Sequence, residues 1–386
     1  MKREELERFS KQRGDKGPNF RSMLAIYDFF DLPFSNDIIT FLARAELERK
    51  KNSFESITVV FISHSEDPSP PRHNYVDSEN YKTYLHNLGF ESTRLFPNVG
   101  SVLFFSNRNE WISFFTNNKS FYSVYPSDYN IDWPNETQIT HRLSIHCHRP
   151  FQENASKDGS DLSVTPPRDA VEYARHWINK NIFPKIPVTI TMRKWKVFSD
   201  HRLSNPQEWQ DLLNLFKDLP VKFIVLKDFH HVMENNPFSG SNSIIWDYPV
   251  LNLSLRAALY QESSLNLAVN QGAFACAVYN RNANYIIFNI LHKGRGGSEE
   301  SLKRLLGLSR NDQFIGSNYF QRLVWEPINS DLIIRETIDC LYELCCSNQI
   351  IPDCYKQKHA SKISEVTSGI RNSLIFLKEK ISSKTN

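Results

Sequence analysis

The 386-residue sequence lacks several features by which whole classes of protein are recognised. No apolar run approaches the roughly 18 residues of a membrane-spanning helix, and the polar start has no apolar core like that of a signal peptide. The six cysteines show neither paired metal-ligand spacing nor the density of a secreted disulfide scaffold. We therefore expect a cytoplasmic protein with reduced thiols and no transmembrane segment.

A large excess of charge of either sign is also missing. Lys and Arg together number 46 and Asp and Glu 43, whereas binding to a nucleic-acid backbone needs a concentrated basic face. We expect no nucleic-acid partner. The hydrophobic fraction of 40% is ordinary for a globular protein, and the length favours two domains because single cores rarely grow beyond about 250–300 residues.

Four short motifs are absent from the chain. It has no Gly-x-Gly-x-x-Gly fingerprint, no phosphate-loop Gly-Lys-Ser/Thr and no Gly-x-Ser-x-Gly elbow, which weakens dehydrogenase, kinase and α/β-hydrolase assignments. It also has no Asp-x-Asp to hold a divalent ion on a diphosphate. His146, Cys147 and His148 do not replace it, because alternate residues of a strand point to opposite faces and no second cluster completes four ligands. We expect neither a metal nor a resident cofactor.

Short apolar runs alternate with helical patterns along the chain. The run at 22–30 precedes a helical pattern that ends near residue 51, and a β-branched run follows at 57–62. This order is typical of a parallel α/β sheet. The same alternation restarts after Pro167, beyond the long polar stretch at 152–165. Two α/β domains are predicted.

The polar stretch and the tail set the predicted boundaries. We predict an N-terminal domain at 1–155, a second domain at 166–355 and a terminal helix at 356–386. Apolar residues recur in that tail at steps of three and four, from Ile363 to Ile381, and form one helical stripe. Such a stripe needs a surface to cover it, which we expect on or near the first domain.

The segment 189–209, TITMRKWKVFSDHRLSNPQEW, brings cations to the end of a buried strand. Arg193 and Lys196 lie at the C-terminal end, where ligands of open α/β sheets bind. A fixed guanidinium suits a diphosphate. A solvated charge cluster that only closes the strand explains these residues equally well.

The same segment carries a family resemblance. Arg193, Arg202, Ser204, Asn205 and Trp209 resemble the central motif of a group of predicted bacterial surface-polysaccharide glycosyltransferases, whose members read approximately ITxR, then RNSN and Trp. The segments YDFFDLPFSNDIITFLARAELER and QRLVWE are also similar to that group, so the resemblance covers most of the chain. It departs at Leu203, where the group has Asn.

This resemblance implies a GT-B fold, with two Rossmann-like α/β/α domains facing a cleft. The first domain would hold a glycan or lipid-linked acceptor and the second a nucleotide-sugar donor. It implies donor-binding roles for Arg193, Lys196, Arg202, Ser204 and Asn205. Peripheral association with a membrane stays open.

Two turns add further candidates for the donor site. Asn270, Gln271 and Gly272 separate a strand from a helix of small residues, so backbone N–H groups can approach an anion. This resembles the GT-B loop under the donor's diphosphate, although one glycine also suits a simple strand–helix turn. The second turn could hold phosphate or serve only as a flexible loop, and contributes Lys293, Arg295, Gly296 and Gly297.

Inverting sugar transfer also needs a base, because the acceptor hydroxyl loses its proton as it attacks the anomeric carbon. Asp31 ends the first strand and is the candidate catalytic base. Asp37 is explained equally well by the helix dipole, and Asp28 by a structural role within the strand. His230 and His231 precede a polar loop, where one could bind the donor or be merely solvated.

Two other functions fit the same residues. Nucleotide-sugar 2-epimerases share the GT-B architecture and would use the donor cleft without a separate acceptor. A degenerate transferase that only binds a sugar nucleotide or a partner protein is favoured by the Leu203 departure. The sequence therefore predicts a metal-independent glycosyltransferase, with these two alternatives open.

Overall fold

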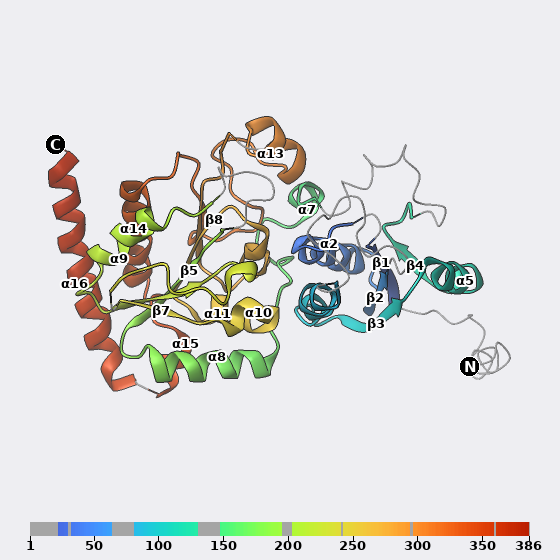
Figure 1. Cartoon of the computed structure of the whole chain (residues 1–386), viewed down its shortest axis with the longest axis horizontal. Helices are drawn as coiled ribbons and strands as arrows, with labels where there is room; N and C mark the ends of the chain where they lie inside the picture. Colours follow the sequence, from blue (N-terminus) through green and yellow to red (C-terminus); the bar gives the residue numbers. More distant parts are fainter. Residues whose placement is uncertain are drawn as a thin grey trace.

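The computed structural model describes residues 22–29, 32–63, 81–129, 147–194, 203–240, 242–293, 296–358 and 360–385. It contains two separate sheets, in which every pair of neighbouring strands is parallel (Figure 1). The first has the strand order β3-β2-β1-β4 and the second β10-β9-β8-β5-β6-β7. Consecutive strands are joined through helices, as the alternating sequence pattern predicts.

Both faces of the first sheet are covered, since successive buried residues along a strand point to opposite faces. Leu24 and Ile26 of β1 pack with Trp111 on one face, whereas Tyr27 points to the other, 5.1 Å from the ring of Phe41. The elements of this domain are β1 (Ser22–Asp28), α2 (Asp37–Lys51), β2 (Ser56–Ile62), α3 (Tyr81–Tyr84), the π-helix η1 (Leu85–Phe90), α4 (Glu91–Thr93), β3 (Val99–Phe105), α5 (Arg108–Asn118), the 3₁₀-helix η2 (Lys119–Phe121) and β4 (Ser123–Tyr125).

The second sheet is the larger, and its central strands are buried throughout. Its elements begin with α7 (Arg149–Asn154), α8 (Arg168–Asn181), β5 (Ile186–Thr191), α9 (Pro206–Leu215), β6 (Val221–Leu226), the 3₁₀-helix η5 (Phe229–His231), β7 (Ser243–Ile245), α10 (Tyr248–Leu251) and α11 (Leu253–Glu262). They continue with β8 (Leu265–Val269), the 3₁₀-helix η6 (Gly272–Phe274), α12 (Ala275–Val278), β9 (Tyr285–Phe288), α13 (Glu299–Leu306), β10 (Gln321–Leu323), α14 (Ser330–Cys346), α15 (Asp353–Lys358) and α16 (Ala360–Thr385).

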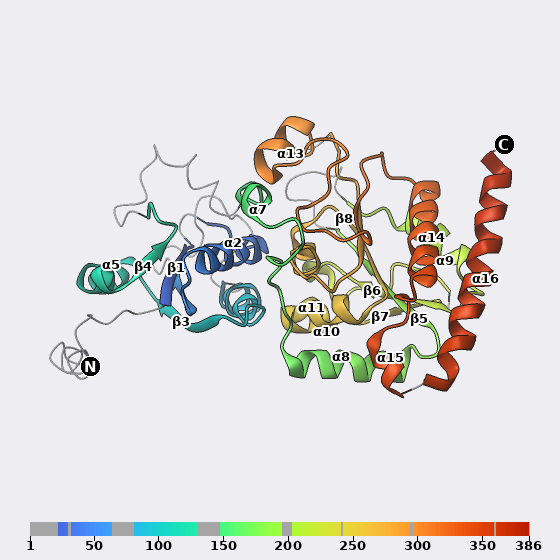
Figure 2. The same ribbon diagram turned by 180° about the vertical axis from the view of Figure 1, so that it is seen from behind.

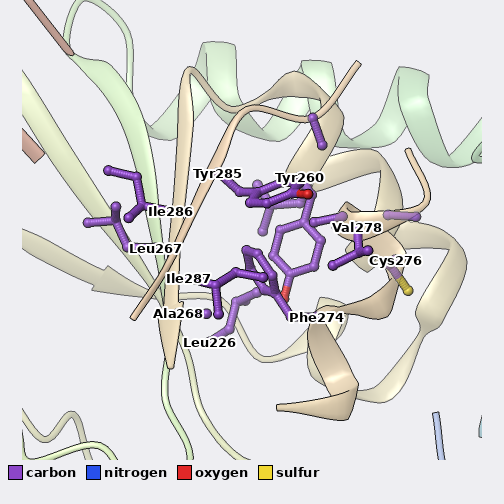
Figure 3. Packing of buried hydrophobic residues seen from close by; sticks show 14 of the residues in the cluster. Leu226, Tyr260, Leu267, Ala268, Phe274, Cys276, Val278, Tyr285, Ile286 and Ile287 are labelled. Carbon is purple, nitrogen blue, oxygen red and sulfur yellow. The ribbon is translucent and has the colours of Figure 1, made fainter. Parts of the chain in front are cut away.

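Two pairs of helices cover this sheet. Helices α8 and α11 pack against each other, as do α9 and α14, and the pairs lie on different sides of the sheet (Figure 2). Figure 3 shows part of the core beside the sheet, where the ring of Phe274 lies between Tyr260 and Tyr285, with centroids 5.0 and 5.8 Å away. This core supports the turn that follows β8, because Phe274 belongs to η6.

The predicted position of the terminal helix is wrong. Helix α16 packs on α14 and α15, at the end of the molecule away from the first sheet (Figures 1 and 2). Its stripe is buried there through Ile370 and Leu374, and Lys378 forms an ion pair with Asp339 at 2.6 Å. The apolar stripe of α16 needs an apolar surface to cover it, and α14 of the second domain supplies that surface. Along the chain, α14 is much closer to α16 than the first domain is.

The segment between the two sheets is hydrogen-bonded to both domains. The amide of Val164 donates to the carbonyl of Tyr279 at 2.9 Å, and the next amide, of Thr165, donates to Leu95 at 2.8 Å. A cleft lies between the domains, so the prediction of two Rossmann-like α/β domains facing a cleft is confirmed. Within the described ranges, no helix is long and apolar enough to cross a bilayer.

Candidate functional site

The strand order of the second sheet reverses between β5 and β8. Strands β6 and β7 follow β5 on one side, whereas β8, β9 and β10 extend the sheet on the other. In open α/β sheets, ligands bind in the crevice outside the carboxyl ends of the strands at such a reversal. The chain leaves β5 at Met192 and Arg193, and it leaves β8 at Asn270. This edge is therefore the candidate site.

The structure brings together two predicted segments at this edge. Arg193 donates from Nη1 to the carbonyl oxygen of Asn270 at 3.4 Å, and Gln271 donates from Nε2 to the carbonyl of Thr191 at 2.9 Å. Both hydrogen bonds cross the reversal between β5 and β8. The guanidinium and the 270–272 turn thus form one unit, although nearly eighty residues separate them in the sequence.

The guanidinium of Arg193 is incompletely satisfied. Its Nε is buried and has no hydrogen-bond partner among the described residues. Burial lowers the pKa of Arg193, and the nearby carboxylate of Asp228 opposes this shift. A buried donor without an acceptor costs roughly 1–3 kcal/mol. An anionic ligand would remove that cost, which makes this position suited to a phosphate or carboxylate.

A cleft opens beside this unit, between the two domains. Its empty volume is about 750 Å³, including open solvent at its mouth. Ser35, Asn36 and Tyr84 line it from the first domain, and Met192, Asp228 and Gln271 line it from the second. The cleft therefore combines the loop after β1 with the carboxyl ends of β5, β6 and β8.

The domains approach each other closely at this cleft. A Cβ atom added to Gly272 would lie 3.5 Å from the Cβ of Asn36, which precedes α2. The Oδ1 of Asn36 is buried and accepts no hydrogen bond within the described part of the chain. The rings of Tyr84 and Phe229 also meet across the cleft, with centroids 5.6 Å apart. A ligand held at Gly272 would thus contact both domains.

Two further predicted residues, Ser204 and Asn205, hold the end of β5 and the start of α9. The Oγ of Ser204 accepts from the amide of Arg193 at 2.9 Å, and the amide of Ser204 donates to the carbonyl of Arg193 at 2.8 Å. Asn205 caps α9 by accepting from the amide of Gln207 at 3.1 Å, ahead of Pro206 at the first helical position. Ser204 therefore fixes the backbone that carries Arg193, and Asn205 fixes the start of α9.

The described residues of the second glycine-rich turn, 293 and 296–297, do not line the cleft. The turn follows β9 and closes on itself, because the amide of His292 donates to the carbonyl of Gly297 at 3.2 Å. A Cβ atom on Gly297 would lie 2.4 Å from the His292 ring, so packing within the turn requires this glycine. Gly296 has a φ of +84°, which also favours glycine, and Lys293 is exposed.

The remaining candidates are either outside the described residues or engaged elsewhere. Asp31, Lys196, Arg202 and Arg295 lie outside the described ranges. Asp28 is buried and forms an ion pair with Arg108. No group of three His, Cys, Asp or Glu side chains in the described part of the chain could hold a metal.

His148 has a structural position at the junction of the domains. It is buried, and its Nδ1 lies 2.6 Å from the hydroxyl of Tyr279, which belongs to the second domain. Burial lowers the pKa of His148 to about 4, so the imidazole is neutral near pH 7. Its hydrogen bond joins the start of α7 to the end of α12.

Sequence reasoning missed Lys227 and Asp228, which follow β6 as Arg193 follows β5. Asp228 accepts from the amide of Lys194 at 3.1 Å and so joins the ends of the two strands. Lys227 is buried and pairs with Asp247 at 3.1 Å. The sequence contains a signal for these two residues, because charged residues directly after a buried strand lie at the ligand-binding edge of the sheet.

No protein-family model and no curated protein matches the chain. Among solved structures, the glycosyl transferase family 9 protein from Veillonella parvula is 9% identical, with a TM-score of 0.48 over 84% of this chain and 98% of that one. The E. coli heptosyltransferase with ADP is 9% identical, with a TM-score of 0.36 over 83% and 99% of the chains. A putative UDP-N-acetylglucosamine 2-epimerase from Listeria monocytogenes is 11% identical, with a TM-score of 0.38 over 85% and 90%.

Proposed function

We propose that this protein is a glycosyltransferase that moves a sugar from a nucleotide-sugar donor to a glycan or lipid-linked acceptor without a metal ion. One observation carries the proposal: the guanidinium of Arg193, with an unpartnered Nε, meets the 270–272 turn at the strand-order reversal. A fixed cation beside a glycine turn is suited to the diphosphate of a donor.

In the proposed reaction the acceptor oxygen attacks the anomeric carbon while the bond from that carbon to the diphosphate breaks. Arg193 and the amides near Gly272 would stabilise the negative charge that develops on the departing nucleoside diphosphate. Asp31 remains the proposed base that receives the proton of the acceptor hydroxyl. Binding between two domains would add the correct orientation of donor and acceptor.

The cleft offers a place for each substrate. The second domain lines the cleft with Gln271, whose neighbour Asn270 accepts from Arg193, whereas the first contributes Asn36, whose unpartnered Oδ1 can accept a hydrogen bond from a sugar hydroxyl. We assign the donor to the second domain and the acceptor to the first. The close approach of Asn36 to Gly272 supports a position of the transferred sugar at the boundary between the domains.

A thermal-shift screen tests the proposal directly, because a ligand that binds only the native state raises its stability. The panel is UDP-glucose, ADP-glucose and GDP-mannose, with the free sugars as controls. We expect at least one sugar nucleotide to raise the melting temperature and the free sugars to leave it unchanged. If no member of the panel binds, the donor site is wrongly assigned.

Product analysis then separates transfer from the alternatives. Incubation with the stabilising sugar nucleotide should release nucleoside diphosphate, and more of it when an acceptor is supplied. Conversion to an isomeric sugar nucleotide with no release would indicate a 2-epimerase. Binding with neither product would indicate a sugar-nucleotide-binding protein.

A further inference from the structure

Arg256 of α11 is a buried cation that lines the cleft. The residue is only 5% exposed, and Leu253, the first residue of the same helix, lines the cleft with it. Arginine side chains are rarely buried to this extent unless their charge is paired. The partners of the guanidinium therefore decide what Arg256 can bind.

Two backbone carbonyls fix the guanidinium of Arg256. Its Nε donates to the carbonyl of Pro249 at 2.9 Å, and its Nη2 donates to the carbonyl of Val250 at 3.1 Å, so the side chain is held against α10. Nη1 makes no hydrogen bond to any residue that the structure describes. Because a guanidinium has five N–H donors, the two on Nη1 remain for a ligand in the cleft.

The charge of Arg256 has no carboxylate partner in the described part of the chain. Glu262, on the same helix, forms an ion pair with Arg175 at 2.8 Å. Glu91 of α4, which contacts α11, pairs with Arg94 at 3.2 Å. A guanidinium is charged at every physiological pH. Arg256 therefore contributes a positive charge that carbonyl oxygens orient but do not neutralise.

The other charged residues on the described wall of the cleft are balanced. Lys227 forms an ion pair with Asp247 at 3.1 Å, and Asp228 attracts the neighbouring guanidinium of Arg193. Each of the two phosphates of a sugar nucleotide carries a negative charge, whereas Asp228 already offsets the charge of Arg193. A site for this diphosphate thus needs a second cation, and Arg256 supplies one.

Helix α11 brings Arg256 to the strand ends that form the proposed donor site. One turn further along the same face of the helix, the hydroxyl of Tyr260 lies 2.9 Å from Oγ1 of Thr191. The carbonyl of Thr191 accepts from Gln271 at 2.9 Å, and the Tyr260 ring packs on Phe274, which follows that turn (Figure 3). Thr191, Gln271 and Arg256 all line the cleft. The cleft therefore presents the 270–272 turn and the Arg256 guanidinium to one ligand.

We propose that Arg256 is a second binding residue for the diphosphate of the sugar nucleotide, to which it donates from Nη1. This inference rests on the proposed function and adds a residue of the cleft wall to the donor site. The two carbonyls fix the guanidinium before the ligand arrives, so little side-chain freedom is lost on binding. As the bond to the sugar breaks, the same contact would stabilise the charge that develops on the departing diphosphate.

Calorimetric titration of the full chain tests this inference with the member of the thermal-shift panel that gives the largest shift. Arg256→Gln should raise the dissociation constant about ten- to hundredfold, because one charge-assisted contact is lost. Arg256→Lys keeps the charge and should bind more tightly than Arg256→Gln. Arg168→Gln is the matched control: it changes the net charge equally at the exposed start of α8, and its affinity should equal that of the wild type.

Salt dependence separates binding of the ligand from support of α10. Both Arg256 variants lose the fork that holds Pro249 and Val250, so both should melt at a lower temperature than the wild type. An increase from about 50 to about 500 mM salt should weaken binding to the wild type and to Arg168→Gln equally, and to Arg256→Gln less.

Two results would overturn the inference. In the first, Arg256→Gln binds as the wild type does. In the second, Arg256→Gln and Arg256→Lys lose affinity equally and keep the salt dependence of the wild type, which would assign Arg256 to the support of α10 alone. Either result leaves the proposed function intact, whereas a wild type that binds no sugar nucleotide would overturn the proposed function itself.

Discussion

Replacement of Arg193 by Ala should weaken sugar-nucleotide binding far more than it weakens the fold. The side chain makes one long hydrogen bond, 3.4 Å from Nη1 to the carbonyl of Asn270, and its Nε has no partner in the described structure. Its removal leaves no strong interaction unmade except the attraction to Asp228. A partly buried guanidinium of this kind, with one long hydrogen bond, contributes up to about 1 kcal/mol to stability, or roughly 2–4 °C in melting temperature.

The expected loss of affinity is larger. One charge-assisted hydrogen bond contributes roughly 1.5–3 kcal/mol, so the dissociation constant should rise about ten- to hundredfold. Arg193→Lys should recover only part of this loss, because an ammonium cannot present the two parallel donors of a guanidinium. The comparison of the two variants separates the contribution of charge from that of geometry.

The assay combines calorimetric titration of the sugar nucleotide with thermal unfolding of the free protein. A normal affinity together with a fall of ten degrees or more in melting temperature would refute the reasoning. Arg193 would then be a structural partner of Asp228, and the diphosphate would have to lie elsewhere. Ser204→Ala is a useful second comparison, because the Ser204 hydroxyl accepts a hydrogen bond from the Arg193 amide, so its removal should reduce affinity indirectly.

Three further predictions concern metal, pH and packing. Because cations rather than a metal-holding carboxylate pair are proposed to bind the diphosphate, EDTA should leave turnover nearly intact, and a complete loss restored by magnesium would refute this mechanism. The pKa of His148 is lowered to about 4, so the free energy of unfolding should fall by about 3 kcal/mol as the pH decreases from about 6.5 to about 4. In thermal unfolding, the melting temperature of His148→Gln should therefore depend less steeply on pH over this interval than that of the wild type. Gly297→Ala places a Cβ 2.4 Å from the His292 ring and should cost about 1–3 kcal/mol, whereas an unchanged melting temperature would show that the ring moves freely.

The sequence by itself determined the elements and their class. Buried runs such as 57–62 and 188–192 are short, β-branched and separated by helical patterns, and that local periodicity is sufficient to predict parallel sheets. It also placed Arg193 and the 270–272 turn at strand ends, because each run shows where its own strand stops. The second turn, around Gly297, was identified for its composition, yet its glycine is required by the adjacent His292.

Only the tertiary structure decided which of these ends meet. Strand order is not encoded locally, so the contact between Arg193 and Asn270 follows from the position of β5 beside β8. The contact of Asn36 with Gly272 likewise depends on how the two domains pack. The stripe of α16 shows the same limit, because an apolar face states that a partner is needed without stating which surface supplies it. Local patterns are properties of neighbouring residues, whereas the site is built from residues that only the packing of whole elements brings together.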